Sequence, residues 1–470
     1  LWHGLSLDCT VAGYVTAFPV VVVLASFWIP LSQRVWRIIL TVYFSLIALV
    51  TAAIFAVDLN LYGYWGFRLD GSVLIYLADP GEALASASWG EVLRQIIIML
   101  VYAGAMIWSY RRILRLFRVE PVSLRGRIVP TVAALLIGGL TFLAIRGGVT
   151  VATANVSKVY FSSNMFLNHA ATNPVFSFLS SVGDNENYAE AYPFFEEERR
   201  KTLFEELRGN RPGADAGTPR LLRSDRPNVV LILLESFGRT IMDETVNGEP
   251  VMPNMQRFKR EGVWFENFFA NSFRTDRGQV AVLCGFPAQT TMSIMKLPRK
   301  SATLPSLARS LGREGYRSVF MYGGDLNFTN QASFMYSTGW EELIWQKDMQ
   351  LDAPTSKWGY ADDVVVDLFG DEVEALGRAE QPFLAGLLTL SSHEPFEVPF
   401  AKFDDKLLNA MAFSDAQIGR LIDRLRESPV WDNLLVVLVA DHGYPYPYDL
   451  AYNCLLYTSP SPRDGATSRM

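Results

Sequence analysis

Four long apolar runs in the first 146 residues constrain the fold of this chain more than any other feature. They lie at residues 11–29, 38–57, 95–110 and 128–145. Each approaches the roughly 20 residues that a bilayer-spanning helix needs, although the third is short. Buried helices of a soluble protein are the alternative, but four such runs flanked by Arg and Trp favour membrane spans. We therefore predict a transmembrane domain over residues 1–146.

The basic residues predict how this domain lies in the membrane. Arg34 and Arg37 follow the first run, and six Arg residues lie between positions 111 and 127, after the third. Under the positive-inside rule both connections are cytoplasmic. The loop 58–94 and all residues after Arg146 are then expected outside the cytoplasm. Residue 1 is Leu and falls on the same outer side, which indicates a fragment or a processed chain.

Residues 147–226 are predicted to be an extracytoplasmic connector and linker. Residues 196–207 have the pattern of a charged amphipathic helix. Residues 209–226 contain Gly, Pro, Asp and Arg without apolar periodicity, as a linker does. His169 has no neighbours at ligand spacing, so a structural histidine is expected there.

From residue 227 onward, apolar strands alternate with helical patterns. The expected strands are residues 228–234, 263–269, 317–322, 383–390 and 434–440, and the expected helices are residues 275–283, 303–314, 360–378 and 404–427. This alternation predicts an α/β domain over residues 227–449, with a mainly parallel sheet and helices on both faces. The patterns stop after Asp449, so we expect a truncated domain followed by a non-native tail at residues 450–470.

Composition and motifs exclude several classes of function. The formal net charge of −6 gives no general case for nucleic-acid binding. The sequence lacks the glycine-rich loops that bind nucleotides. Its three Cys residues are far apart and form neither a disulfide framework nor a zinc knuckle.

Two of the expected strands end in side chains that bind metals. Glu235 follows the first strand of this domain, and Asp441 and His442 follow the last. In open α/β sheets ligands bind at the carboxyl ends of the strands, so we expect these residues at one rim with Thr275 nearby. Two carboxylates, an imidazole and a hydroxyl suit one divalent cation such as Mn²⁺, Mg²⁺ or Zn²⁺.

Thr275 lies where a helical pattern begins, between Arg274 and Arg277. The N–H groups and the dipole at a helix N-terminus favour an anion, and the two Arg side chains could hold one. A hydroxyl placed there is ready to attack a phosphate or sulfate ester. Ordinary helix capping by Thr is the alternative. The metal-ligating residues at the two strand ends favour the nucleophile.

Four motifs in this order resemble the lipoteichoic acid synthase and phosphoglycerol transferase branch of the sulfatase/alkaline phosphatase superfamily. They are Leu-Glu-Ser at 234–236, Ser-Phe-Arg-Thr-Asp-Arg-Gly at 272–278, Ser-Ser-His-Glu-Pro-Phe at 391–396 and Ala-Asp-His-Gly at 440–443. The resemblance implies an alkaline phosphatase-like α/β/α sandwich anchored in the bacterial inner membrane. It also implies five membrane spans, so a first helix is expected to be missing before residue 1.

The activity implied by the resemblance is transfer of phosphoglycerol from phosphatidylglycerol, a membrane phospholipid, to an envelope glycan or polymer. The implied cofactor is one divalent ion, with Mn²⁺ preferred and Mg²⁺ or Zn²⁺ as alternatives. Its implied ligands are Glu235, Thr275, Asp441 and His442, and Thr275 is also the nucleophile that becomes phospho-threonine. His393 is implied as a substrate contact; its place after a strand suits proton donation to the leaving group, although a polar turn is the alternative.

Residues 323–331 align with a substrate-binding segment of the same family. The family has a Trp and an Arg where this chain has Thr329 and Gln331. Asp325 and Asn330 therefore either bind the substrate in another way or shape a turn. This departure leaves the donor and the acceptor open.

Other functions remain as alternatives. Sulfatases modify a Cys or Ser within Cys/Ser-x-Pro-x-Arg, whereas this chain has Thr-Asp-Arg-Gly-Gln at 275–279. A phosphoethanolamine transferase shares the architecture, and a phosphodiesterase would pass the intermediate to water. A non-catalytic envelope protein would be favoured by an altered ligand set, but all four implied ligands are present.

Overall fold

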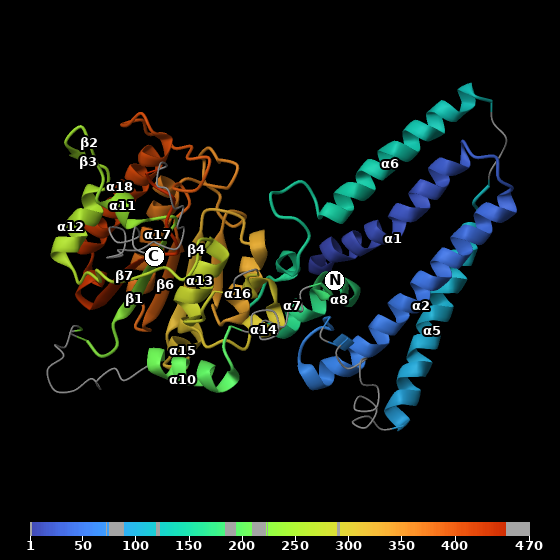
Figure 1. The fold of residues 1–470 in the computed structure, drawn as a ribbon, viewed down its shortest axis with the longest axis horizontal. Helices are drawn as coiled ribbons and strands as arrows, with labels where there is room; N and C mark the ends of the chain where they lie inside the picture. Colours follow the sequence, from blue (N-terminus) through green and yellow to red (C-terminus); the bar gives the residue numbers. More distant parts are fainter. Residues whose placement is uncertain are drawn as a thin grey trace.

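The computed structural model describes most of the chain and shows two bodies joined by a connector (Figure 1). The described residues are 2–71, 73–74, 89–118, 123–183, 194–208, 222, 224–288 and 292–447. Four long helices form one body, and an α/β domain forms the other. The predicted tail at 450–470 and most of the predicted linker at 209–226 lie outside the described residues.

Four helices of the described residues are long and apolar enough to cross a membrane. They are α1 (Leu5–Ser26), α2 (Gln33–Trp65), α5 (Trp89–Leu114) and α6 (Ile128–Arg146). Their side chains are mostly exposed in the isolated chain, as expected for helices whose apolar surface faces lipid. The prediction of four apolar N-terminal helices is therefore confirmed, and each helix is longer than the apolar run that indicated it.

The four helices place their connections at two opposite ends. α1 packs against α6 and α2 packs against α5. At the end away from the α/β domain, the Arg37 guanidinium donates to the Phe117 carbonyl at 2.9 Å. At the near end, the Thr10 hydroxyl donates to the Ala144 carbonyl at 2.9 Å. The two Arg-rich connections thus lie together at the end far from the α/β domain (Figure 1).

The connector contains α7 (Met165–Ala171), α8 (Pro174–Ser181) and α10 (Glu197–Arg208). Asn164 and Asn173 begin the first two helices by accepting hydrogen bonds from backbone N–H groups of the first turn. α7 and α8 lie between the four long helices and the α/β domain (Figure 1).

Three polar contacts tie the near end of the helices and the connector directly to the α/β domain. The Asn155 amide donates to the Asn327 carbonyl at 2.8 Å, and the Ser333 N–H donates to the Ser157 hydroxyl at 3.0 Å. Arg299 forms an ion pair of 3.5 Å with Asp70, just beyond α2. The α/β domain is therefore docked on the helical body rather than joined to it by the linker alone.

The α/β domain contains one five-stranded sheet. Its strands are β1 (Asn228–Leu234), β4 (Arg317–Tyr322), β5 (Glu342–Trp345), β6 (Phe383–Leu388) and β7 (Leu434–Ala440), in the order β5-β4-β6-β1-β7. Every neighbouring pair is parallel. This confirms the predicted parallel sheet.

Helices cover both faces of this sheet. Along β1, Val230 and Ile232 point to one hydrophobic core and Leu231 and Leu233 to the other. The first core is closed by α12 (Pro253–Glu261), α17 (Asp362–Gly377) and α18 (Lys406–Glu427). The second is closed by α13 (Thr275–Cys284), α15 (Leu307–Arg313) and α16 (Gln331–Ser337). Strand burial on both faces explains the continuous apolar runs seen in the sequence.

The expected strand at residues 263–269 is wrong. This segment has no strand, and several of its apolar side chains are exposed, including Val263 at 62% and Phe265 at 67%. An apolar run alone does not decide between a strand and an irregular segment, because a strand also needs a neighbour for its ladder. The edge strand β5 and the helices α12 and α16 were not anticipated.

Candidate active site

Sheet register brings the carboxylates of Glu235 and Asp441 together. β1 and β7 are parallel neighbours with Leu234 opposite Ala440, so the next residue of each strand leaves the sheet at the same rim. α13 approaches this rim from one face of the sheet. Gly278 makes that approach possible, because a Cβ there would collide with the Asp441 backbone carbonyl.

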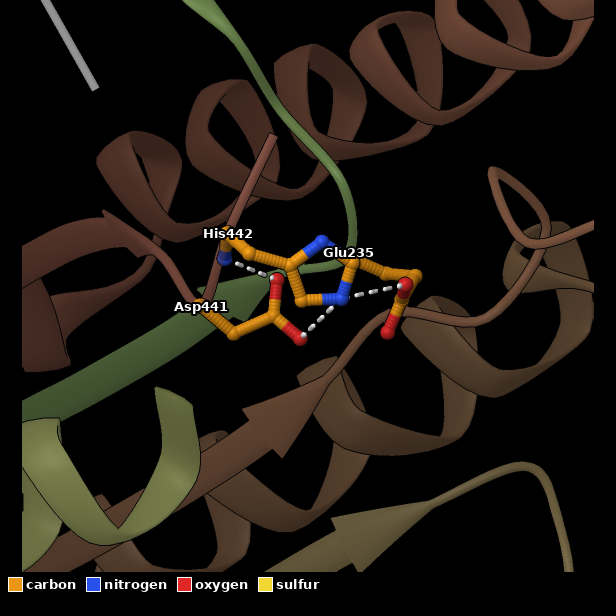
Figure 2. Close-up of side chains that lie close together, drawn as sticks. All are labelled: Glu235, Asp441 and His442. Atoms are coloured by element: carbon orange, nitrogen blue, oxygen red, sulfur yellow. Dashed lines mark hydrogen bonds and ion pairs between the residues drawn. The ribbon is translucent and has the colours of Figure 1, made fainter. Parts of the chain in front are cut away.

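Glu235, Asp441 and His442 converge into one compact cluster (Figure 2). His442 Nε2 lies 3.4 Å from Glu235 Oε1 and 3.6 Å from Asp441 Oδ2. One potential ligand atom from each residue lies within 4.8 Å of the others. All three residues are buried, so the cluster is shielded from bulk water.

Thr275 completes the cluster with its hydroxyl. Thr275 Oγ1 donates to Glu235 Oε2 at 3.0 Å and lies 3.2 Å from His442 Nε2. The residue that caps α13 is Arg274, and Thr275 is the first residue of the helix itself. The Thr275 hydroxyl therefore faces the cluster. The alternative explanation of this motif required the hydroxyl to cap the helix, which it does not do.

The His442 ring is oriented by its other nitrogen. His442 Nδ1 lies 2.9 Å from the Gly443 carbonyl oxygen, which can only accept a hydrogen bond. A neutral ring therefore carries its proton on Nδ1, and Nε2 is left facing Glu235 and Thr275, which is the arrangement of a metal-ligating histidine. Burial opposes the charged ring, but the charges of Asp441 and Glu235 outweigh it and raise the His442 pKa, so without a cation Nε2 tends to hold a proton.

The loop after β6 fixes the Glu235 backbone on both sides. The Glu235 N–H donates to Thr389 Oγ1 at 2.9 Å, and Ser392 Oγ donates to the Glu235 carbonyl at 2.7 Å. Asp362, buried at the start of α17, holds this loop by accepting from the Leu390 N–H at 2.7 Å. These positioning residues were missed in the sequence, where the only signal was a run of polar residues directly after a strand.

Ser236 is a second link between the two strand ends. Its backbone has a φ of +62°, which is uncommon for a residue other than Gly. In this conformation the Ser236 N–H donates to Asp441 Oδ1 at 3.1 Å, and its hydroxyl donates to Glu235 Oε1 at 2.8 Å. Local strain at this position is therefore coupled to the orientation of both carboxylates.

The electrostatics of the cluster favour a bound cation. Burial and the neighbouring charge of Glu235 raise the pKa of Asp441 to about 8. Burial opposes the charged form of Glu235, but His442, His393 and hydrogen bonds outweigh it and lower the Glu235 pKa. Asp441 Oδ2 accepts no hydrogen bond from the described residues. Two carboxylates in a dry pocket with an orphaned oxygen fit a divalent metal ion.

The two Arg residues beside Thr275 lie in different surroundings. Arg274 is half exposed and lines a cavity next to the helical body. Arg277 is buried, with its guanidinium carbon 5.4 Å from the centre of the Phe273 ring. Arg274 is therefore the better placed of the two to meet a ligand that enters from that cavity.

His393 lies in the loop after β6, at the same rim as Glu235. Its ring packs against Trp358 at an interplanar angle of 55°, with 4.7 Å between the ring centres, and Nδ1 lies 2.8 Å from the Glu394 carbonyl. Its charge lowers the Glu235 pKa, although it is not part of the compact cluster. The structure thus places His393 beside the site, where its role stays a prediction.

The segment 323–331 has a mixed outcome. Asp325 accepts hydrogen bonds from the backbone and side chain of Asn327, so it shapes a turn. Asn330 donates to the Lys296 carbonyl and lines the cavity that Arg274 also lines. Gln331 accepts from the Gln279 amide at 3.1 Å and so packs against α13. Gln331 therefore contributes to the packing of α13 against the segment 323–331.

Comparison with known proteins identifies the α/β half of the chain. The sulfatase family model matches residues 227–459. We call this half the sulfatase-family domain, after the family whose model it matches. The match begins one residue before β1 and includes the four segments that supply Glu235, Thr275, His393 and Asp441.

Relatives of the sulfatase-family domain include two groups of transferases. Phosphoglycerol transferase I of Xanthomonas campestris is 35% identical over 251 residues, which cover 48% of this chain and 35% of that protein. Lipoteichoic acid synthase 1 of Bacillus subtilis is 26% identical, covering 46% of this chain and 36% of that protein. The chain thus spans about a third of the length of the curated relatives that it matches.

Solved structures also match part of the chain. A protein of the alkaline phosphatase superfamily from Vibrio parahaemolyticus has a TM-score of 0.46 at 27% identity, covering 51% of this chain and 60% of that one. The lipoteichoic acid synthase LtaP of Listeria monocytogenes has a TM-score of 0.47 at 22% identity, covering 52% of this chain and 63% of that one.

Proposed function

We propose that this protein is a membrane-anchored phosphoglycerol transferase. In this proposal it moves phosphoglycerol from phosphatidylglycerol to an envelope glycan or polymer. The observation that supports it most is the Thr275 hydroxyl, which lies at a helix N-terminus and contacts both Glu235 and His442. The relatives named phosphoglycerol transferase I and lipoteichoic acid synthase 1 support the same reaction class.

Glu235, Asp441, His442 and the Thr275 oxygen would hold one divalent ion, for which Mn²⁺ is the first choice and Mg²⁺ or Zn²⁺ the alternatives. When bound, such an ion lowers the pKa of a coordinated hydroxyl and neutralises charge on a phosphoryl group. The buried carboxylates, the oriented His442 Nε2 and the orphaned Asp441 Oδ2 fit this cofactor. The ligands present do not discriminate strongly between these three ions.

In the first half-reaction, Thr275 Oγ1 gives its proton to Glu235 Oε2, which already accepts its hydrogen bond, and attacks the phosphorus of the lipid. A bond forms between Thr275 and phosphorus, and the bond between phosphorus and the diacylglycerol oxygen breaks. The N-terminus of α13 stabilises the negative charge on the phosphoryl oxygens. His393 protonates the departing diacylglycerol oxygen; its Nδ1 faces a carbonyl, which leaves Nε2 for the transfer.

In the second half-reaction, an acceptor hydroxyl attacks the phospho-threonine. Neutral His393 takes the proton of that hydroxyl. The bond between phosphorus and Thr275 breaks, and Glu235 returns the proton to the Thr275 oxygen. The enzyme returns to its starting state because the proton given to diacylglycerol is recovered from the acceptor. The positions of Thr389 and Ser392 keep Glu235 aligned throughout, since both bond its backbone.

We further propose that the sulfatase-family domain lies outside the cytoplasm of a bacterial cell, next to the inner membrane. The Arg-rich connections lie at the end of the helices away from this domain, which fits the positive-inside rule. A lipid donor in the adjoining leaflet and an envelope acceptor would then be on the same side as Thr275.

The test is peptide mass spectrometry on the full chain in detergent micelles with phosphatidylglycerol and Mn²⁺. We expect a glycerophosphate adduct on Thr275 and release of diacylglycerol. The Thr275→Ala variant should form no adduct, and Thr275→Ser should form one more slowly. A folded, metal-loaded protein without any adduct would overturn the proposal.

Parallel incubations separate the alternatives. An adduct formed only from phosphatidylethanolamine indicates a phosphoethanolamine transferase, and cleavage of sulfate esters indicates a sulfatase. An adduct that passes only to water indicates a phosphodiesterase. No reaction with any of these substrates indicates a non-catalytic protein.

A further inference from the structure

A cavity of about 840 Å³ lies where the sulfatase-family domain meets the helical body. One wall comes from residues just beyond α2 and α6 and from the connector, including Phe67, Arg68 and Phe176. The opposite wall comes from the sulfatase-family domain, including Lys296 and Phe328. The volume falls in the range of roughly 300–1,000 Å³ that is usual for ligand sites.

The lining of this cavity is strongly basic. Five basic residues and one acidic residue, Asp70, contribute to it. The basic residues are Arg68, Arg274, Lys296, Arg299 and Lys300. Arg68 is paired with Asp58, Arg274 with Asp276 and Arg299 with Asp70, so the excess positive charge comes from Lys296 and Lys300. An anionic ligand is the electrostatic complement of such a wall.

The same cavity has an apolar side. Phe67, Val151, Phe176, Leu297 and Phe328 all line it. His169 adds no charge near neutral pH, because burial and the charge of Arg68 lower its pKa to about 4. A ligand that matches both sides has an anionic group and an apolar portion.

The position of the cavity indicates where such a ligand comes from. α2 ends at Trp65 and α6 ends at Arg146, and the lining segments 67–71 and 151–156 follow directly. Residues just beyond the end of a membrane span lie at the level of lipid head groups. Arg274, which lines the cavity, is the neighbour of Thr275.

We propose that this cavity binds the anionic head group of a glycerophospholipid from the adjoining leaflet, with Lys296 and Lys300 holding its phosphate and Arg274 leading toward Thr275. The delivery of this lipid to Thr275 rests on the proposed function. The binding itself does not, since it requires only the charge, the apolar wall and the location of the cavity.

The test measures lipid binding in the full chain carrying Thr275→Ala, so that no turnover occurs. Native mass spectrometry in micelles compares phosphatidylglycerol with zwitterionic phosphatidylcholine. We expect saturable binding of phosphatidylglycerol, weakened about tenfold by Lys296→Gln with Lys300→Gln, because each removes a charged partner of the phosphate. The matched control is Lys259→Gln with Lys347→Gln, two lysines of the same domain that do not line the cavity.

A second variant tests the cavity with a substitution that is not expected to affect folding. Ser180 lines the cavity and is exposed, so Ser180→Trp should fill space and reduce phosphatidylglycerol binding without loss of thermal stability. Equal binding of the two lipids, or unchanged binding in both cavity variants, would overturn the inference. Binding of glycerol phosphate as tight as that of the lipid would assign the site to free phosphates instead. Normal lipid binding without an adduct on Thr275 in the unsubstituted chain would contradict the proposed function but would leave the lipid-binding inference intact.

Discussion

At the rim of the sheet, Glu235, Asp441 and His442 are enclosed and lie in contact with one another. In the cavity beside the helical body, Lys296 and Lys300 are exposed at the edge of a space large enough for a ligand. The rim is therefore a rigid site with excess negative charge, whereas the cavity is an open site with excess positive charge. Buried charges interact strongly and are little screened by salt, while exposed charges are screened by it. The two sites should respond differently to the same perturbations.

Removal of the Thr275 hydroxyl is expected to have the largest effect and to affect the rim alone. If Thr275 is the nucleophile, as proposed, Thr275→Ala should lower transfer from phosphatidylglycerol by about 10³-fold or more. Lipid binding in the cavity should be unchanged, because the Thr275 hydroxyl contacts Glu235 and His442 and Thr275 does not line the cavity. Transfer assays and native mass spectrometry on the same sample measure both quantities. Loss of lipid binding in this variant would break the separation of the two sites.

Metal binding should stabilise the protein through Asp441. At 100 times the dissociation constant, an ion bound only to the folded state raises the free energy of unfolding by about 2.7 kcal/mol. Asp441→Asn keeps an acceptor for the Ser236 N–H but cannot ionise to become the negatively charged ligand that a cation needs. We expect this variant to lose the Mn²⁺-dependent rise in melting temperature without losing metal-free stability.

The control for the metal experiment is Asp423→Asn, which changes an exposed acid paired with Arg257. It should keep the full response to Mn²⁺. Equal responses of the two variants would show that Mn²⁺ acts somewhere other than the rim.

Salt should distinguish the cavity from the rim. Raising the NaCl concentration from 50 to 500 mM shortens the screening length severalfold, so phosphatidylglycerol binding in the cavity should weaken by several-fold. The Mn²⁺-dependent stabilisation should change little over the same range. The double variant Lys296→Gln with Lys300→Gln should lose most of the salt dependence of lipid binding. If the salt dependence persists in this variant, the anion binds at another site.

The smallest expected effect concerns His169, which borders the cavity. Its folded pKa of about 4 lies below the unfolded value of about 6.5, so folding favours the neutral ring. The stabilising contribution is therefore present above pH 6.5 and is lost as the pH falls toward 4. We expect the melting temperature to fall between pH 7 and pH 5 by more in the unsubstituted chain than in His169→Gln, which does not titrate there. Parallel pH profiles would show that His169 does not take part.

The strand ends of the rim could be predicted from the sequence because they follow from local patterns. A buried parallel strand is apolar on both faces, and its carboxyl end is where ligands bind. Glu235 and Asp441 stand out for this reason, since each follows an uninterrupted apolar run. Thr275 could be assigned to a helix N-terminus by the same reasoning, although its hydroxyl contacts are tertiary.

The other features of the fold and the site could not be predicted, because they depend on contacts between segments that are far apart in the sequence. Residues 263–269 have the composition of a strand but no neighbouring strand, so their apolar side chains stay exposed. Arg274 and Arg277 are alike in the sequence, yet one lines a cavity and the other is buried over Phe273. The cavity itself joins residues as far apart as Asp70 and Arg299, which no local pattern connects.

The contacts between the connector and the sulfatase-family domain limit how far Thr275 can move relative to the four long helices. Asn155 and Ser157 bind the sulfatase-family domain at Asn327 and Ser333, and Asp70 binds it at Arg299. These contacts make the connector a spacer of fixed height, so Thr275 stands at one distance from the bilayer and does not sample the volume that a free tether allows. If the proposed function holds, the acceptor hydroxyl has to reach Thr275 at this one height, so the spacer would set which part of the acceptor can be modified.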